Sequence, residues 1–162
     1  MTGRDWIEFV SESLKNKIDK IEAQEEKLEQ MKTDYYCLTA IMYEVDRVQS
    51  SCDGDKLAKQ YAQIEEFEKR LEIQIREFER YRNEILEKVY TYLPNVNLCN
   101  VVVDRHIFFM TKNEIAQELG ITPIAVSKRF AKAYNLLDSI YVLEKYRKKI
   151  KNVDIIPQQV VL

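Results

Sequence analysis

The sequence contains few residues that interrupt helices. Its 162 residues include only three Gly and three Pro, whereas charged residues make up 32%. Scarce helix breakers together with abundant Glu, Lys, Gln and Leu favour long helices over an antiparallel sheet. We therefore predict an all-α protein.

Long apolar runs are also lacking. No run approaches the roughly 20 residues that a helix needs to span a bilayer. Residues 1–15 carry acids where a signal peptide would be apolar. We expect a cytoplasmic protein with no membrane partner.

Cysteine and histidine are too scarce to suggest site chemistry. Cys37, Cys52 and Cys99 are odd in number and lack C-x-x-C spacing, so neither a disulfide framework nor a zinc site is expected. His106 has no second His or Cys near it, and we expect a packing or surface role for it. Gly-rich phosphate loops, nucleophile elbows and H-E-x-x-H motifs are missing too. We predict no enzymatic activity, no metal and no cofactor.

Residues 111–137 carry the pattern of a helix-turn-helix. Thr111 and Glu114 have the spacing of a capping box at the start of a helix. Gly120 stands where that helix would end in a left-handed turn. Thr122 and Pro123 then fit the N-cap and first position of a second helix.

The second helix of this motif, residues 123–137, is predicted to read the major groove of DNA. Val126 would return to the core. Four residues would face away from the core toward base edges: Thr122, Ile124, Ser127 and Lys128. Four cations would hold phosphates and set the register: Arg105, Lys112, Arg129 and Lys132.

Charge is segregated along the chain. Residues 1–104 hold 15 Lys and Arg against 22 Asp and Glu, a net charge of −7. Residues 105–162 hold 10 against 5, a net charge of +5, in the segment that carries the motif. Phosphate binding requires such a distribution. An alternative is that Arg147, Lys148, Lys149 and Lys151 only solvate a helix C-terminus, where cations are favoured.

Two heptad series precede the motif. The first runs Leu14, Ile21, Leu28, Tyr35, Met42, and the second runs Leu57, Ile64, Leu71, Phe78, Ile85, Tyr92. Turn-forming residues 50–55 separate them, and Pro94 closes the second. We predict a long antiparallel, coiled-coil-like helical hairpin over residues 1–93, a helix-turn-helix domain over 94–152 and an apolar tail over 153–162. Pro157 prevents a continuous helix in that tail, which we expect to dock on the body.

The hairpin is expected to oligomerise. Five aromatic residues fall beside its seam and predict a third surface, which would be a second copy or the C-terminal domain: Trp6, Phe9, Tyr43, Phe67 and Tyr81. We favour a homodimer formed through the hairpin. Polar residues interrupt the seam at heptad positions and would fix its register: Glu25, Lys32, Glu68 and Arg82.

The region from Arg105 to Leu137 carries a set of residues found in a known family. The set comprises Arg105-His106-Ile107, Thr111, Asn113-Glu114-Ile115-Ala116, Leu119-Gly120 and Val126. This region resembles region four of bacterial sigma factors, in the version carried by small phage-encoded regulators of the ArpU type. Those regulators place an acidic helical hairpin before the motif, as this chain does. The resemblance implies a phage or prophage transcriptional regulator that binds double-stranded DNA.

Two departures from the family pattern leave alternatives open. Arg129 stands where an apolar residue is usual, so either Phe130 takes the core position or the motif no longer reads DNA. Phe108-Phe109-Met110 replaces a polar spacer and suggests docking onto the hairpin. The alternative function is a protein-interaction module whose acidic hairpin binds a host factor such as RNA polymerase, with a helix-turn-helix that does not read DNA.

Overall fold

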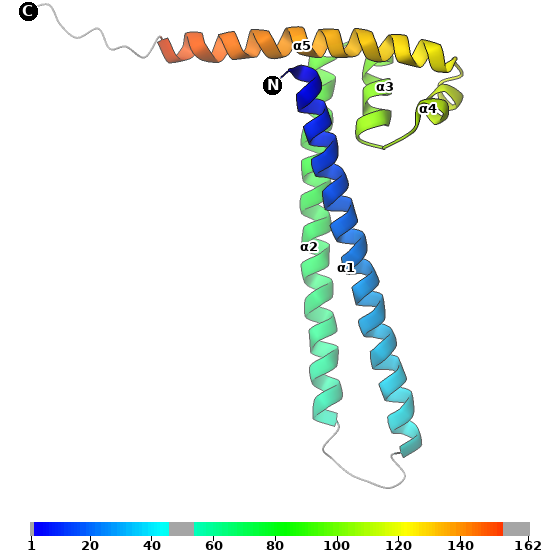
Figure 1. Cartoon of the computed structure of the whole chain (residues 1–162). Coiled ribbons are helices and arrows are strands. Elements are labelled where there is room, and N and C mark those ends of the chain that lie inside the picture. The colour runs from blue at the N-terminus through cyan, green and yellow to red at the C-terminus, as the bar shows by residue number, and fades with distance from the viewer. Residues whose placement is uncertain (1, 46–53, 154–162) are drawn as a thin grey trace, which may run out of the picture. The chain divides into compact units, whose positions relative to one another are not determined.

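The computed structural model describes residues 2–45 and 54–153. These residues form five α-helices and no strand (Figure 1). The helices are α1 (Gly3–Val45), α2 (Gly54–Tyr92), α3 (Val96–His106), α4 (Lys112–Glu118) and α5 (Pro123–Val153). The all-α prediction is confirmed for this part of the chain. None of the helices described is both long and apolar enough to cross a membrane.

Several predictions concern residues outside this description. Of the predicted turn residues 50–55, Gly54 and Asp55 belong instead to α2. Residues 50–53, which include Cys52, and the tail from residue 154 are not among the described residues. The side chains of residues 42–45 and 141–153 are not described either, so the basic cluster at 147–151 is placed only by its helix backbone.

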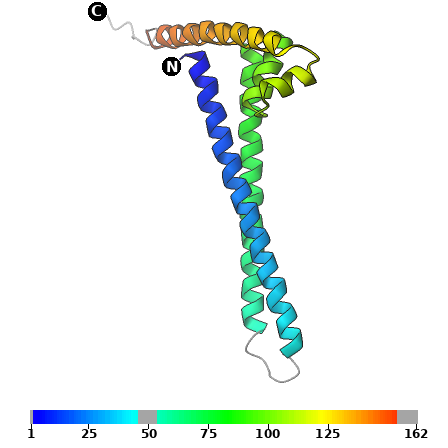
Figure 2. The same ribbon diagram turned by 45° about the vertical axis from the view of Figure 1, so that its right-hand side comes forward.

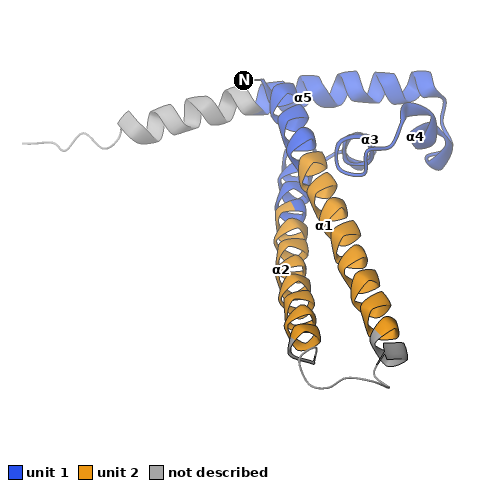
Figure 3. Ribbon diagram, turned by 60° about the horizontal axis from the view of Figure 1, so that its bottom comes forward, with its two compact units in different colours: residues 1–13, 82–162 blue, residues 14–81 orange. Residues whose placement is uncertain are grey.

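Contacts divide the chain into two compact units (Figure 3). The head unit consists of residues 1–13 and 82–162, and the arm unit consists of residues 14–81. Both long helices therefore contribute to both units. The predicted boundary between residues 93 and 94 falls inside the head unit.

In the arm unit, α1 and α2 run alongside each other (Figure 2). Ile64 and Leu71 of α2 are buried. Lys32 Nζ of α1 lies 2.6 Å from Glu68 Oε1 of α2, and both side chains are about one third exposed. These are two of the polar residues that were predicted to interrupt the seam. Their pairing links the helices at one defined register.

Aromatic residues flank the seam on both sides. The Tyr35 ring lies 5.9 Å from that of Tyr61 and 5.8 Å from that of Tyr36. Lys17 Nζ lies 5.3 Å from the Tyr81 ring centroid, and Lys27 Nζ lies 5.5 Å from that of Phe67. In each pair between helices, a later residue of α1 meets an earlier residue of α2, so the helices run in opposite directions in this unit.

The head unit has its own core. The first turns of α1 and the end of α2 supply Ile7, Val10, Ile85, Val89 and Leu93, which are all buried. The remaining buried apolar residues come from α3, α4 and α5 and from Ile107, which follows α3: Cys99, Val101, Val102, Val103, Ile107, Ile115, Ala116, Val126, Phe130, Ala133 and Leu137. Since α3, α4 and α5 contact one another and share this core, the motif is supported from several directions.

The N-terminus of α1 is anchored directly on α5. A β-carbon at Gly3 would collide with the backbone carbonyl of Leu137 and lie 2.7 Å from the Asp138 nitrogen, so only glycine allows this approach. The Arg4 amide donates to Asp138 Oδ1 at 2.9 Å. Trp6 packs edge-on against Tyr92 with ring centroids 5.7 Å apart. Trp6 therefore packs on the hairpin itself, which is neither of the two surfaces predicted for the aromatic residues beside the seam.

Candidate nucleic-acid interface

The start of α4 is fixed by a complete capping box. Thr111 Oγ1 accepts from the Glu114 amide at 3.3 Å, and Glu114 Oε2 accepts from the Thr111 amide at 2.6 Å. Two donors that a helix leaves unpaired at its first turn are thereby satisfied. Hydrogen bonding from the Thr111 amide, and secondarily from its side chain, lowers the pKa of Glu114, because it favours the ionised carboxylate. The predicted capping box is confirmed.

The turn after α4 is closed by two backbone bonds. Gly120 has φ +62°, and its amide donates to the Gln117 carbonyl at 3.3 Å. The Ile121 amide donates to the Ala116 carbonyl at 2.9 Å. This pairing is a Schellman motif, in which the left-handed residue is most often glycine. The left-handed turn predicted at Gly120 is present.

The start of α5 has the predicted cap. Thr122 Oγ1 accepts from the Ala125 amide at 3.2 Å, and the Thr122 carbonyl accepts from the Val126 amide at 3.1 Å. Pro123 is the first helical residue, where its missing amide hydrogen leaves no bond unmade. The two helices are therefore joined by a tight, hydrogen-bonded turn.

The inner face of α5 shows which residue takes the core position that Arg129 left open, whereas DNA reading by the motif stays a prediction. Val126, Phe130, Ala133 and Leu137 are buried, whereas Arg129 is half-buried. Phe130 thus takes the apolar position and also stacks on Tyr134, with ring centroids 5.8 Å apart. The Arg129 side chain remains partly accessible at the border of the outer face.

The outer face of the motif carries the residues predicted to read bases. Thr122, Ile124, Ser127 and Lys128 are all exposed, and Ile124 is 70% exposed. Ile124, Ser127 and Lys128 share one side of α5, because residues three and four positions apart lie on one helix face. Thr122 is also the N-cap, so its hydroxyl oxygen is engaged with α5 while its hydrogen remains able to donate.

The residues predicted to hold phosphates differ in their exposure and in their hydrogen bonding. Lys112 and Lys132 are exposed. Arg105 is exposed too, but its Nη1 donates to the Met110 carbonyl at 3.1 Å and bridges the connector between α3 and α4. Lys112, Arg129 and Lys132 belong to the two helices of the motif, whereas Arg105 belongs to α3.

The connector itself is tightly folded. Phe109 has φ +58°, an uncommon conformation for a bulky residue, and the Met110 amide donates to the Asp104 carbonyl at 2.9 Å. Phe108 is 53% exposed, whereas Ile107 is buried. Docking of Phe108 onto the hairpin, which the sequence suggested, stays a prediction.

Behind the motif, two polar side chains link α3 to α5. His106 is buried, and its Nε2 lies 2.8 Å from the Tyr134 hydroxyl. Burial, together with a smaller effect of the neighbouring Arg105, lowers the pKa of His106 to about 4, so the ring is neutral at pH 7. The Arg4 guanidinium lies 5.2 Å from the centroid of the Tyr134 ring. His106 has the packing role allowed for it.

Sequence reasoning missed the part played by the N-terminus in this unit. Residues 2–13 were assigned to the hairpin, but Gly3, Arg4 and Trp6 contact α5 and the end of α2. The only local signal was a glycine near the start of a strongly helical segment, where glycine is unfavourable by about 1 kcal/mol relative to alanine.

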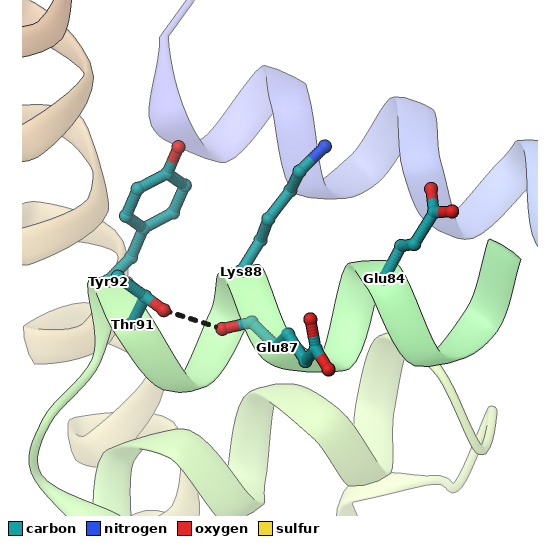
Figure 4. Close-up of a pocket in the computed structure, with 5 residues that line it drawn as sticks. All are labelled: Glu84, Glu87, Lys88, Thr91 and Tyr92. Carbon is teal, nitrogen blue, oxygen red and sulfur yellow. Dashed lines mark hydrogen bonds between the residues drawn. The ribbon is translucent and has the colours of Figure 1, made fainter. Parts of the chain in front are cut away.

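The described surface also has a hollow away from the motif. This hollow at the end of α2 is lined by Glu84, Glu87, Lys88, Thr91 and Tyr92 (Figure 4). Thr91 Oγ1 donates to the Glu87 backbone carbonyl at 2.8 Å, so it is bonded within its own helix. Alternating Glu and Lys at this spacing are typical of a solvated helix surface. No group of His, Cys, Asp or Glu suited to a metal occurs among the residues that could be searched.

The thiol of Cys99 is buried and protonated. Its side chain is fully buried, and desolvation raises the pKa of the thiol to about 11, which keeps it protonated.

Comparisons with family models, with curated proteins and with solved structures find no match to this chain.

Proposed function

We propose that this chain is a sequence-specific DNA-binding regulator of transcription that reads the major groove with helix 123–137. The observation that carries the proposal is the outer face of this helix. Ile124, Ser127 and Lys128 stand exposed together, while Val126 and Phe130 are buried beneath them. A recognition helix requires such a division, in which one side packs on its own domain and the other meets base edges.

The chemistry of the exposed side chains fits the proposed partner, double-stranded DNA. Ile124 offers an apolar contact for a thymine methyl, and Lys128 offers a donor for guanine acceptors. Lys112, Arg129 and Lys132 supply cations for phosphates, which position a protein without reading sequence. The net charge of +5 over residues 105–162 favours the same partner.

The proposal includes the finer organisation predicted from the sequence. Residues 94–152 would form a helix-turn-helix domain similar to sigma region four, with a phage or prophage origin for the protein. Residues 1–93 would form the antiparallel hairpin, with its first turns anchored on α5. Since a single small reading head binds weakly, association of copies through the hairpin would increase affinity for two half-sites, and the predicted homodimer is the smallest such assembly.

A mobility-shift assay on genomic fragments tests DNA binding. We expect the parent protein to retard the migration of the fragments at low salt, and the Lys128→Ala, Arg129→Ala double variant to lose this effect. A matched control, Lys15→Ala, Lys69→Ala, removes the same charge from exposed positions of the arm unit and should bind as the parent does. Lack of binding at low salt by the folded parent protein would overturn the proposal in favour of a protein-interaction module.

A further inference from the structure

The two sides of the seam in the arm unit differ in charge. Each residue of a helix is turned by about 100° from its predecessor, so residues just after a seam position lie on one flank and residues just before it lie on the other. Because α1 and α2 run in opposite directions, the flanks after the seam positions of both helices share one face of the pair. The flanks before the seam positions share the opposite face.

The residues after the seam positions form an acidic face. They follow Ile21, Leu28 and Tyr35 in α1 and Ile64, Leu71 and Phe78 in α2. The acidic face comprises Glu22, Glu29, Tyr36, Glu65, Glu72 and Glu79, all of them exposed. Five glutamates occupy these six positions, and the equivalent position after Leu14 holds the exposed Lys15.

The residues before the seam positions form a basic face. Its cations are Lys20, Lys27, Lys56 and Arg70, all of them exposed. Asp34 and Glu77 are the acids at equivalent positions, so cations outnumber acids by four to two. Lys27, which lies over the Phe67 ring, belongs to this side of the pair.

Exposed apolar groups occur on both faces at the same level of the arm. Tyr36 is 67% exposed on the acidic face, and the 51% exposed Tyr61 lies on the same side. Leu38 and Ile41, which are 40% and 58% exposed, lie on the basic side within two turns of Tyr36. A partner that covers one of these faces must therefore combine charge with an apolar patch near the end of the arm.

We propose that the partner is a second copy of this chain, with the acidic face of one arm lying on the basic face of the next. Parallel, front-to-back stacking sets glutamates against lysines along the arm. It also places Tyr36 of one copy over Leu38 and Ile41 of the next, because all three belong to α1. Tyrosine rings additionally favour the ammonium groups of the opposing face.

Two-fold pairing through either face alone is opposed by charge. It would bring glutamates onto glutamates, or lysines onto lysines, and like charges across an interface are costly. The front-to-back interface leaves one face open at each end, so assembly continues beyond two copies unless it closes into a ring. This interface is independent of DNA binding and goes beyond a simple homodimer.

Paired charge-reversal variants of the full chain test the proposal. An all-acidic variant carries Lys20→Glu, Lys27→Glu and Lys56→Glu, and an all-basic variant carries Glu22→Lys, Glu29→Lys and Glu65→Lys. Every altered position is exposed, and circular dichroism checks that helix content is retained. Sedimentation equilibrium measures the mass of each variant alone and of their equimolar mixture.

We expect the parent chain at low salt to exceed the 19.3 kDa of one copy, with a mass that rises with concentration and falls as salt is added. Each variant alone should remain at 19.3 kDa, and the mixture should associate. Any of three results would overturn the proposal. The parent chain could be monomeric, either variant alone could self-associate to the parent's level, or the mixture of folded variants could stay monomeric. The mobility-shift assay with the Lys128→Ala, Arg129→Ala variant reports on DNA binding alone, so its outcome is independent of these results.

Discussion

His106 Nε2 and the Tyr134 hydroxyl lie 2.8 Å apart and join α3 to α5 behind the proposed reading face. The pair is largely desolvated, which lowers the pKa of His106 to about 4 from its ordinary value of 6.5. The unfolded chain therefore takes up this proton at a higher pH than the folded chain does. Protonation of His106 at low pH therefore destabilises the contact between α3 and α5.

Stability should fall as the pH drops from about 6.5 to about 4, with no contribution from this group above that window. The loss attributable to His106 is on the order of 3 kcal/mol in the free energy of unfolding. Urea unfolding at pH 7 and pH 4.5 measures it, with His106→Gln as the variant that cannot titrate. Equal losses of stability in parent and variant would contradict this role.

Replacing Gly3 by alanine should destabilise the protein, although alanine is ordinarily better in a helix by about 1 kcal/mol. The added β-carbon would collide with the Leu137 carbonyl, which belongs to backbone and cannot turn away. A loss of about 1–3 kcal/mol is expected, as for other overpacked sites. Thermal unfolding compares it with Asn16→Ala, an exposed helical position where a small gain is expected. A gain at both positions would mean that α1 is not anchored on α5.

Gly120→Ala should also destabilise, but for a different reason. Nothing lies near the added β-carbon, so the cost comes from φ +62° alone and is about 1 kcal/mol. Chemical unfolding measures the loss. Gly120→Asn should lose less, because asparagine tolerates the left-handed conformation better. Equal stability of all three proteins would rule out the left-handed turn.

The Lys32–Glu68 pair predicts a double-mutant cycle. Lys32→Glu and Glu68→Lys each place like charges across the seam and should each cost about 0.5–1 kcal/mol, a modest value because both side chains are partly exposed. Exchanging both residues restores opposite charges and should recover most of the loss. If the double variant were as unstable as the sum of the single variants, the two residues would not be coupled.

The parts of the fold that depend on local chemistry were predictable from the sequence. The capping box at Thr111, the left-handed turn at Gly120 and the proline-started α5 each involve residues within a few positions of one another. Their hydrogen bonds are determined by side-chain type and spacing, so a single sequence is enough to infer them.

The parts that depend on distant contacts were not predictable. The Arg4 amide bonds Asp138 across 134 positions, and no periodic pattern reports such a pairing. The sequence left open whether Phe130 takes the core position that Arg129 cannot fill, and packing shows that Phe130 is buried. Likewise, the bond from Arg105 to the Met110 carbonyl depends on how the connector folds, which composition does not encode.

The salt dependence of DNA affinity tests the central claim most directly. We expect log Kobs to fall linearly with log salt for the parent chain, and the Lys112→Ala, Lys132→Ala variant to reduce the slope by about 2, since each phosphate contact contributes about 0.9. Ile124→Ala should weaken binding to the preferred fragment while leaving the slope unchanged, because it removes a base contact only. Equal slopes for the parent and the lysine variant, or no binding at any salt concentration, would contradict a reading face on α5.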